Sequence, residues 1–206
     1  MPITINGTTG ISGVDGSAGS PAVIGSDADT GLVFAAGQVS ASINGVTGNV
    51  PLVSGTAQNS TSGTSIDFTG IPSWVKRVTV MFNGVSTNGL SGIRVQLGTS
   101  SGLETTGYNG STVRTAGASL GTVTISSGFD IGGFGVQTET QNGQFIISLF
   151  QASSNTWACS GSLGGNAVTN TTAGIKSLAS TLTQLRITTV NGTDTFDAGA
   201  INILYE

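Results

Sequence analysis

The chain has 206 residues, of which 33 are glycine, 26 serine and 30 threonine, and only 8% are charged. It has no histidine and one cysteine, which excludes histidine-dependent catalytic triads, imidazole metal sites, a disulfide within one chain and thiolate zinc cages. Six basic residues and a net charge of −4 provide no positive surface for a phosphate backbone, so we expect no nucleic-acid partner.

Residues 1–60 are poor in large apolar side chains. Phe34 is their only aromatic residue, and small apolar clusters such as Ile3 with Ile5 and Leu32 with Phe34 are separated by glycine-rich turns. Burial contributes roughly 25 cal/mol per Å², whereas ordering costs about 1.5 kcal/mol per residue, so clusters of this size do not fold alone. We therefore expect an extended, glycine-rich attachment region that other chains hold in place, with these four side chains at a subunit interface.

Residues 61–206 show the two-residue periodicity of β-strands. Apolar residues alternate with polar ones at Val78, Val80 and Phe82, at Ile93, Val95 and Leu97, at Leu185 and Ile187, and at Ile201, Ile203 and Tyr205. Asn-Gly pairs, which favour tight hairpin turns, occur at Asn83-Gly84, Asn88-Gly89, Asn109-Gly110, Asn142-Gly143 and Asn191-Gly192. Many short strands with frequent turns predict an antiparallel sandwich or barrel. We expect an all-β chain in which residues 61–206 form an antiparallel, jelly-roll-like β-sandwich.

The segment from Phe145 to Phe150 is apolar on both faces of the expected strand. Such a strand needs cover on both sides. One side belongs to the core, and the other is covered either by a neighbouring subunit or by a loop of the same chain. The first alternative places Ile146 and Phe150 at a subunit interface.

Two aromatic residues stand in polar, loop-like surroundings. Tyr108 is followed by Asn109, and Trp157 comes two residues after Asn155. An exposed ring stacks against a sugar ring while neighbouring amides bond the sugar hydroxyls. These four residues are therefore candidate ligand contacts, and the alternative is that the two rings pack in the core.

The acidic residues do not form a recognisable site. Asp27 and Asp29 supply two carboxylates where Ca²⁺ takes about six to eight oxygen ligands, so turn or strand-end roles explain them better. Glu104, Asp130 and Glu139 are scattered singly and do not form the carboxylate pair that a glycosidase needs. We expect no catalytic residue, no metal site and no cofactor.

Four segments resemble structural proteins of tailed phages. Residues 9–34, from Thr-Gly-Ile-Ser-Gly-Val-Asp-Gly to Asp-Ala-Asp-Thr-Gly-Leu-Val-Phe, are similar to a segment of tail fibres and other virion proteins. Residues 68–87, with the run Gly-Ile-Pro-Ser-Trp-Val-Lys-Arg, resemble the C-terminal domain of phage and prophage tail-fibre proteins. Those proteins also tend to carry a Glu-Thr-Thr-Gly-Tyr segment, here 104–108, and a closing Ala-Gly-x-Ile-Asn-Ile strand, here 198–205.

This resemblance implies a homotrimeric tail fibre that attaches the virion to the host cell surface, with a surface polysaccharide as the receptor. Residues 1–60 would dock on another virion protein. A capsid decoration or head-fibre protein is an alternative that needs the same fold and trimer. A glycan-depolymerising tailspike is less favoured, because it needs a carboxylate pair and usually a longer β-helical body.

The expected location is the virion, on the tail or the capsid surface. Residues 1–7 have neither the basic region nor the apolar run of a signal peptide, so we expect synthesis in the host cytoplasm without one. No apolar run approaches the roughly 18 residues of a membrane span, and we expect no membrane insertion.

Overall fold

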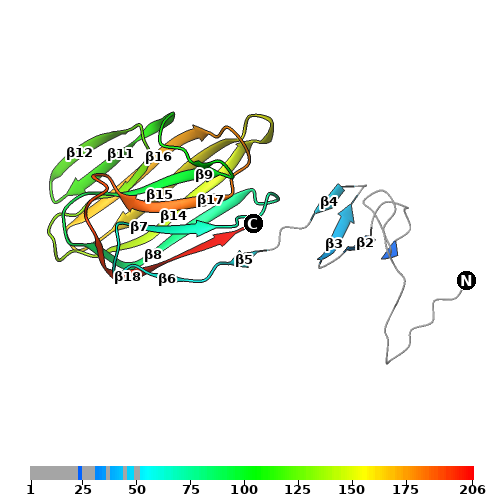
Figure 1. Ribbon diagram of the computed structural model, residues 1–206, viewed down its shortest axis with the longest axis horizontal. Coiled ribbons are helices and arrows are strands. Elements are labelled where there is room, and N and C mark those ends of the chain that lie inside the picture. The colour runs from blue at the N-terminus through cyan, green and yellow to red at the C-terminus, as the bar shows by residue number, and fades with distance from the viewer. Residues whose placement is uncertain (1–22, 25–30, 36–37, 44–45, 49–51) are drawn as a thin grey trace, which may run out of the picture. The chain divides into compact units, whose positions relative to one another are not determined.

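The computed structural model describes residues 23–24, 31–35, 38–43, 46–48 and 52–206. The chain divides into two compact units, Met1–Pro51 and Leu52–Glu206 (Figure 1). All strand pairs in the described ranges are antiparallel, and no α-helix occurs there. The all-β prediction is therefore confirmed. No helix of the described residues has the length and apolar character needed to cross a membrane.

The first unit contains a four-stranded antiparallel sheet. Its strands follow one another in chain order as β1 (Val23–Ile24), β2 (Gly31–Ala35), β3 (Gln38–Ile43) and β4 (Val46–Gly48). The sequence predicted an extended segment in this region, whereas the structure pairs these strands into a sheet. Leu32 and Phe34 lie in β2, opposite Ala41 and Val39 of β3. Ile3 and Ile5 lie outside the described residues, and the predicted interface at these four positions stays a prediction.

The second unit contains two sheets. The larger has the order β12-β11-β16-β15-β14-β8-β18-β5 with β6 beside β18, and the smaller has the order β10-β9-β17-β7 with β13 beside β9. Strands of the larger sheet are β5 (Val53–Ser54), β6 (Gln58–Asn59), β8 (Arg77–Thr87), β11 (Tyr108–Ala116), β12 (Ser119–Ile125), β14 (Gln141–Gln151), β15 (Thr156–Gly164), β16 (Val168–Ser177) and β18 (Phe196–Tyr205). Strands of the smaller sheet are β7 (Ser65–Thr69), β9 (Ile93–Thr99), β10 (Gly102–Leu103), β13 (Phe129–Gly132) and β17 (Gln184–Thr189).

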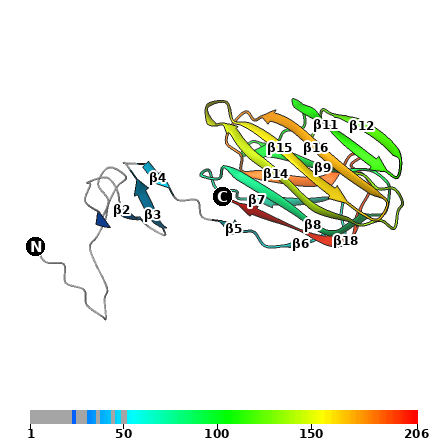
Figure 2. The same ribbon diagram turned by 180° about the vertical axis from the view of Figure 1, so that it is seen from behind.

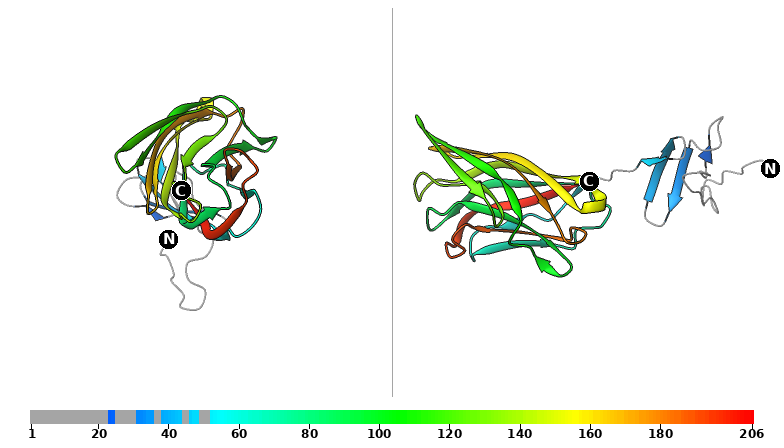
Figure 3. Two further views of the ribbon diagram at one scale, coloured as in Figure 1. Left: turned by 90° about the vertical axis from the view of Figure 1, so that its left-hand side faces the viewer. Right: turned by 90° about the horizontal axis from the view of Figure 1, so that it is seen from above.

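The two sheets face each other in a sandwich-like arrangement. Figures 1 and 2 view this unit from opposite sides, and β14, β15 and β16 lie behind β9 and β17 in one and in front of them in the other. Figure 3 shows the same two layers from one end and from above. The core lies between the layers because alternate strand residues point to it. Buried members include Val78, Val80 and Phe82 of β8, Ile93, Val95 and Leu97 of β9, and Leu185 and Ile187 of β17.

The second unit begins at Leu52 rather than at residue 61. Both β5 and β6 pair with β18, with Ser54 opposite Leu204 and Gln58 opposite Ile201. Residues 52–60 resemble the N-terminal region in composition, but backbone pairing along β18 assigns them to the larger sheet. Composition contains no information on backbone pairing. The boundary expected from the sequence, between residues 60 and 61, therefore lies nine residues after the one in the structure.

Central strand β14 has one buried and one open face. Phe145 and Ile147 are buried in the core, as the sequence predicts. On the other face Ile146 is half-buried, and Phe150 keeps 71% of its surface exposed. No loop of the described residues covers Phe150, so the alternative in which a loop of the same chain covers this face does not hold for this side chain.

Three of the five Asn-Gly pairs lie inside strands instead of at turns. Asn83-Gly84 is in β8, Asn109-Gly110 in β11 and Asn142-Gly143 in β14. The register of β14 against β8 shifts between Gln141 and Gly143, which marks a β-bulge. Glycine inside a strand tolerates such bulges, so long strands continue through signals that resemble hairpin turns. Asn191-Gly192 lies in a turn between β17 and β18, where the Gly192 N–H bonds the Thr189 carbonyl. These two strands belong to different sheets, so this turn does not close the hairpin that the sequence predicted.

Candidate functional site

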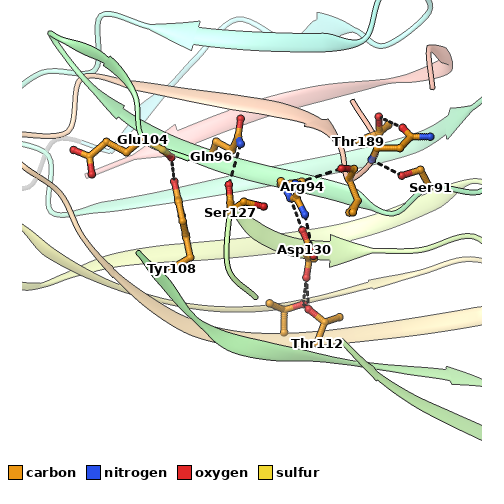
Figure 4. Close-up of polar contacts among 12 residues, drawn as sticks. Ser91, Arg94, Gln96, Glu104, Tyr108, Thr112, Ser127, Asp130 and Thr189 are labelled. Atoms are coloured by element: carbon orange, nitrogen blue, oxygen red, sulfur yellow. Dashed lines mark hydrogen bonds and ion pairs between the residues drawn. The ribbon is translucent and has the colours of Figure 1, made fainter. Parts of the chain in front are cut away.

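Tyr108 is buried, contrary to the prediction of an exposed stacking ring. It is 5% exposed, and its ring packs edge-on against Phe129 with centroids 4.9 Å apart. Its hydroxyl accepts a hydrogen bond from the Leu97 N–H at 2.7 Å. It donates one to the Glu104 carbonyl at 2.9 Å (Figure 4). Burial raises the pKa of the phenol above its ordinary value, against the opposing effect of the Leu97 hydrogen bond. Tyr108 therefore ties β11 to β9 and to the segment after β10, and does not face solvent.

Trp157 is a core residue as well, with 3% of its surface exposed. Lys176 of β16 lies between the two aromatics, opposite Trp157 on one side and Tyr108 on the other. Its ammonium lies 5.5 Å from the Tyr108 ring centroid and pairs with Glu104. The structure thus places the two predicted rings on either side of Lys176. All three side chains are buried, and the Lys176–Glu104 ion pair lies beside them, so they offer no exposed ring for a sugar.

The two predicted asparagines lie elsewhere. Asn109 is exposed and follows Tyr108 on β11, so its side chain points to the outer face. Asn155 is half-buried, with a left-handed φ of 47°, at the end of the short 3-10 turn Ala152–Ser154. Its N–H donates to the Ala152 carbonyl, and its carbonyl accepts from the Leu178 N–H. The four predicted ligand residues therefore do not form one accessible site.

A different hollow lies where β11, β12 and β16 of the larger sheet meet β13 and the loop before β9. It is a cleft of about 290 Å³, open to solvent. We call it the Arg114 cleft. Its lining residues are Leu90, Ser91, Gly92, Thr112, Arg114, Val123, Asp130, Gly132, Gly133, Asn170 and Val190.

Asp130 is the acidic residue of the cleft, and both its carboxylate and its carbonyl accept hydrogen bonds. Arg94 of β9 holds the carboxylate at two points, with Nε 2.6 Å from Oδ1 and Nη2 3.3 Å from Oδ2. The Asp130 carbonyl accepts hydrogen bonds from the hydroxyls of Thr112 and Thr172, the second at 2.9 Å (Figure 4 labels Thr112). A carboxylate already paired with a guanidinium is a poor general base, so Asp130 positions its neighbours.

Arg114 is the cation of the cleft without an acidic partner among the described residues. The other three arginines and Lys176 each pair with an acid in that part of the chain, and Lys76 is exposed. Arg114 donates from Nη2 to the Phe134 carbonyl, while its Nε is buried and finds no hydrogen-bond partner there. A buried donor without a partner is costly, and a guanidinium is charged at every ordinary pH.

The rim of the cleft is apolar. Leu90 is 53% exposed, Val123 48% and Val190 40%. Gly92 lets the loop lie directly against β13, because a Cβ at this position would come within 2.4 Å of the Gly132 carbonyl oxygen. Apolar walls around a few directed polar groups are the general pattern of small-molecule sites.

Loops behind the cleft are braced by Glu139, which is 1% exposed. Its carboxylate accepts hydrogen bonds from the N–H groups of Gly135 at 2.6 Å, Ala167 at 3.0 Å and Val168 at 2.9 Å. Burial acts to raise the pKa of Glu139, but these N–H donors outweigh it and hold the pKa below its ordinary value. Glu139 thus fixes the loop that presents the Phe134 carbonyl to Arg114.

A second hollow, the outer groove, lies on the far side of the Arg94–Asp130 pair. It also has about 290 Å³, and its lining is polar. Arg94 and Val190 are among its residues, and Val190 lines the cleft too. The outer groove is lined by Thr64, Ser65, Arg94, Gln96, Arg186, Thr188, Thr189, Val190, Asn191 and Gly192.

Sequence reasoning missed this site because its signal is a tertiary one. In the sequence, Asp130 is one of several acids scattered singly along the chain, and nothing marks Arg94 as its partner. Arg114 lies an even number of residues from Tyr108 and Thr112, so it is on the same, inward face of its strand. A charged residue on an inward face is the one signal in the sequence that indicates a site here. Which residues lie opposite that face depends on how the sheets pack.

The arrangement suits recognition of a small polar molecule. No group of three or more acidic or thiol side chains that would hold a metal ion occurs in the part of the chain that the structure describes. Comparison with protein-family models, with curated proteins and with solved structures gives no match.

Proposed function

We propose that this chain is a structural protein of a phage virion, a trimeric tail fibre that attaches the particle to the host cell surface by binding a glycan. The observation that carries the binding role is the Arg114 cleft, with apolar walls and directed polar groups. Its volume of about 290 Å³ lies close to the lower end of the roughly 300–1,000 Å³ found for small-molecule sites, which suits a ligand the size of one sugar ring. The virion role is supported by the resemblance of residues 9–34, 68–87, 104–108 and 198–205 to tail-fibre sequences.

The cleft favours binding over glycan cleavage. Glycosidases generally use two carboxyl groups on either side of the scissile bond. Among the residues that line the cleft, Asp130 is the one carboxylate, and Arg94 already holds both its oxygens. We therefore propose no enzymatic role and leave the tailspike as the least favoured alternative.

The proposed trimer is supported by the open face of the larger sheet. Ile146 is half-buried and Phe150 is 71% exposed on the outward side of β14, although neighbouring strands flank β14 on both edges. A second copy would cover these side chains. Light scattering tests this: we expect a trimer for the wild type, and a smaller species for Phe150→Glu but not for Val136→Glu, which charges an exposed loop position instead. A wild-type monomer contradicts the proposal.

We also propose that Leu52–Glu206 is a β-sandwich of the jelly-roll kind. Successive strands cross between the sheets, from β7 to β8 to β9 and again from β16 to β17 to β18, which supports this assignment.

Adsorption to host cells tests the attachment role. Purified protein is expected to bind the host and to compete with phage infection at micromolar concentration. Val123→Trp, which fills the cleft from β12, is expected to abolish binding. Leu120→Trp, which faces the other side of the same strand, keeps it. No adsorption by the wild type overturns the role.

A capsid decoration or head-fibre protein is the second candidate, with the same fold and trimer. Electron microscopy of virions with labelled antibody separates the two, because label appears on the tail for the first and on the shell for the second.

A further inference from the structure

We infer that the Arg114 cleft recognises an acidic sugar, with the sugar carboxylate bound by Arg114. This inference rests on the proposed glycan-binding function and adds the chemical class of the ligand. It starts from the Arg114 guanidinium, which lines the cleft and has no acidic partner among the described residues.

The charge of the cleft favours an anion. Asp130 neutralises Arg94, so the pair contributes no net charge, and Arg114 adds one positive charge. This local charge is opposite in sign to the net charge of −4 of the whole chain. A carboxylate in the cleft would pair with the Arg114 guanidinium, because the two groups are complementary in charge and in planar geometry.

The remaining groups favour a sugar over a simple anion. Asn170 donates from Nδ2 to the Gly133 carbonyl at 3.2 Å, which leaves acceptor capacity on its Oδ1. Ser91 offers a further hydroxyl at the rim, and Leu90, Val123 and Val190 offer apolar surface for the carbon face of a ring. An acidic peptide would pair its carboxylate with Arg114, but it has no ring that would contact Asn170, Ser91 and the apolar rim at the same time.

Titration with four probes tests the inference on the wild-type protein. D-glucuronate is expected to bind about tenfold more tightly than D-glucose or the methyl ester of glucuronate, since only the free acid carries the carboxylate. N-acetylglutamate, the peptide-like acid, is expected to bind more weakly than glucuronate. In NMR spectra of the arginine Nε–H groups, glucuronate is expected to shift the Arg114 signal, which Arg114→Lys identifies by its loss.

Variants separate recognition from folding. Arg114→Lys and Arg114→Met are expected to remove the preference for glucuronate over its ester, and thermal unfolding monitored by circular dichroism shows whether each variant folds. Lys76→Met removes one exposed charge away from the cleft and is expected to keep the preference. The NMR readout on the wild type holds even if both Arg114 variants misfold.

The outcomes distinguish this inference from the proposed function. Equal affinity for glucuronate, its ester and glucose, or an unmoved Arg114 signal during binding, overturns the acidic-sugar inference and leaves glycan attachment intact. Tighter binding of N-acetylglutamate than of glucuronate also overturns it, in favour of a peptide ligand. Absence of binding to every sugar together with absence of host adsorption overturns both.

Discussion

Arg94 and Asp130 form a two-point ion pair that joins β9 to β13 and separates two hollows of the surface. Arg94 lines the outer groove, and Asp130 lines the Arg114 cleft. Their side chains are 13% and 9% exposed, so the pair is largely withdrawn from water. This pair fixes the wall that any ligand of either hollow would contact.

Loss of the Asp130 charge is therefore expected to destabilise the fold. Asp130→Asn leaves the Arg94 cation partly buried and uncompensated, which costs about 3 kcal/mol or more in free energy of unfolding. Asp67→Asn is the matched control, because the Arg186–Asp67 pair has side-chain exposures of 37% and 39%. Its cost is expected to stay below about 1 kcal/mol. Urea denaturation measures both values, and equal costs would contradict the role given to Arg94–Asp130.

Tyr108→Phe separates a structural role from a ligand role. The change removes the hydroxyl between the Leu97 N–H and the Glu104 carbonyl and is expected to cost about 1 to 3 kcal/mol, because the Leu97 donor is left buried. Binding to host cells is expected to remain unchanged in protein that stays folded. Weaker binding at unchanged stability would restore Tyr108 as a ligand contact.

Glu139 is expected to make stability depend on pH. Its pKa in the folded state lies below the ordinary value of 4.5, so its contribution is present above that value and is lost as the pH falls through the lowered pKa. Glu139→Gln is expected to lose about 1 to 3 kcal/mol at pH 7, because one N–H acceptor is replaced by a donor. The difference between wild type and variant should shrink at pH 3 or below. Urea denaturation at both pH values checks this, and a difference independent of pH would refute it.

Cys159 is expected to resist thiol reagents while the protein is folded. It is 7% exposed, and burial raises its pKa to about 12 despite a hydrogen bond from the Gly174 backbone. The reactive thiolate is therefore scarce at pH 8, whereas an unfolded cysteine has a pKa of about 8.5. Iodoacetamide labelling followed by mass spectrometry should be slow in buffer and fast in denaturing urea. Fast labelling of native protein would show that β15 opens locally.

The sequence by itself determined the class of this fold. Two-residue alternation at Val78, Val80 and Phe82 requires a half-buried strand whatever its neighbours are, because successive side chains point to opposite faces. The absence of histidine and the single cysteine restricted the chemistry in the same direct way. These inferences concern local periodicity or side-chain type, and neither depends on long-range packing.

Tertiary structure alone decided the ends of elements and the location of the site. Asn109-Gly110 has the residues of a hairpin turn, yet pairing with β16 on one side and β12 on the other keeps it inside a strand. Tyr108 stands in a polar sequence but is buried, because the packing of β9 against β11 supplies a partner for its hydroxyl. Strand register and the stacking of two sheets place Asp130 beside Arg94 and in the same cleft as Arg114. Local sequence patterns do not predict such long-range pairing, because the contacts form between strands that are far apart in the chain.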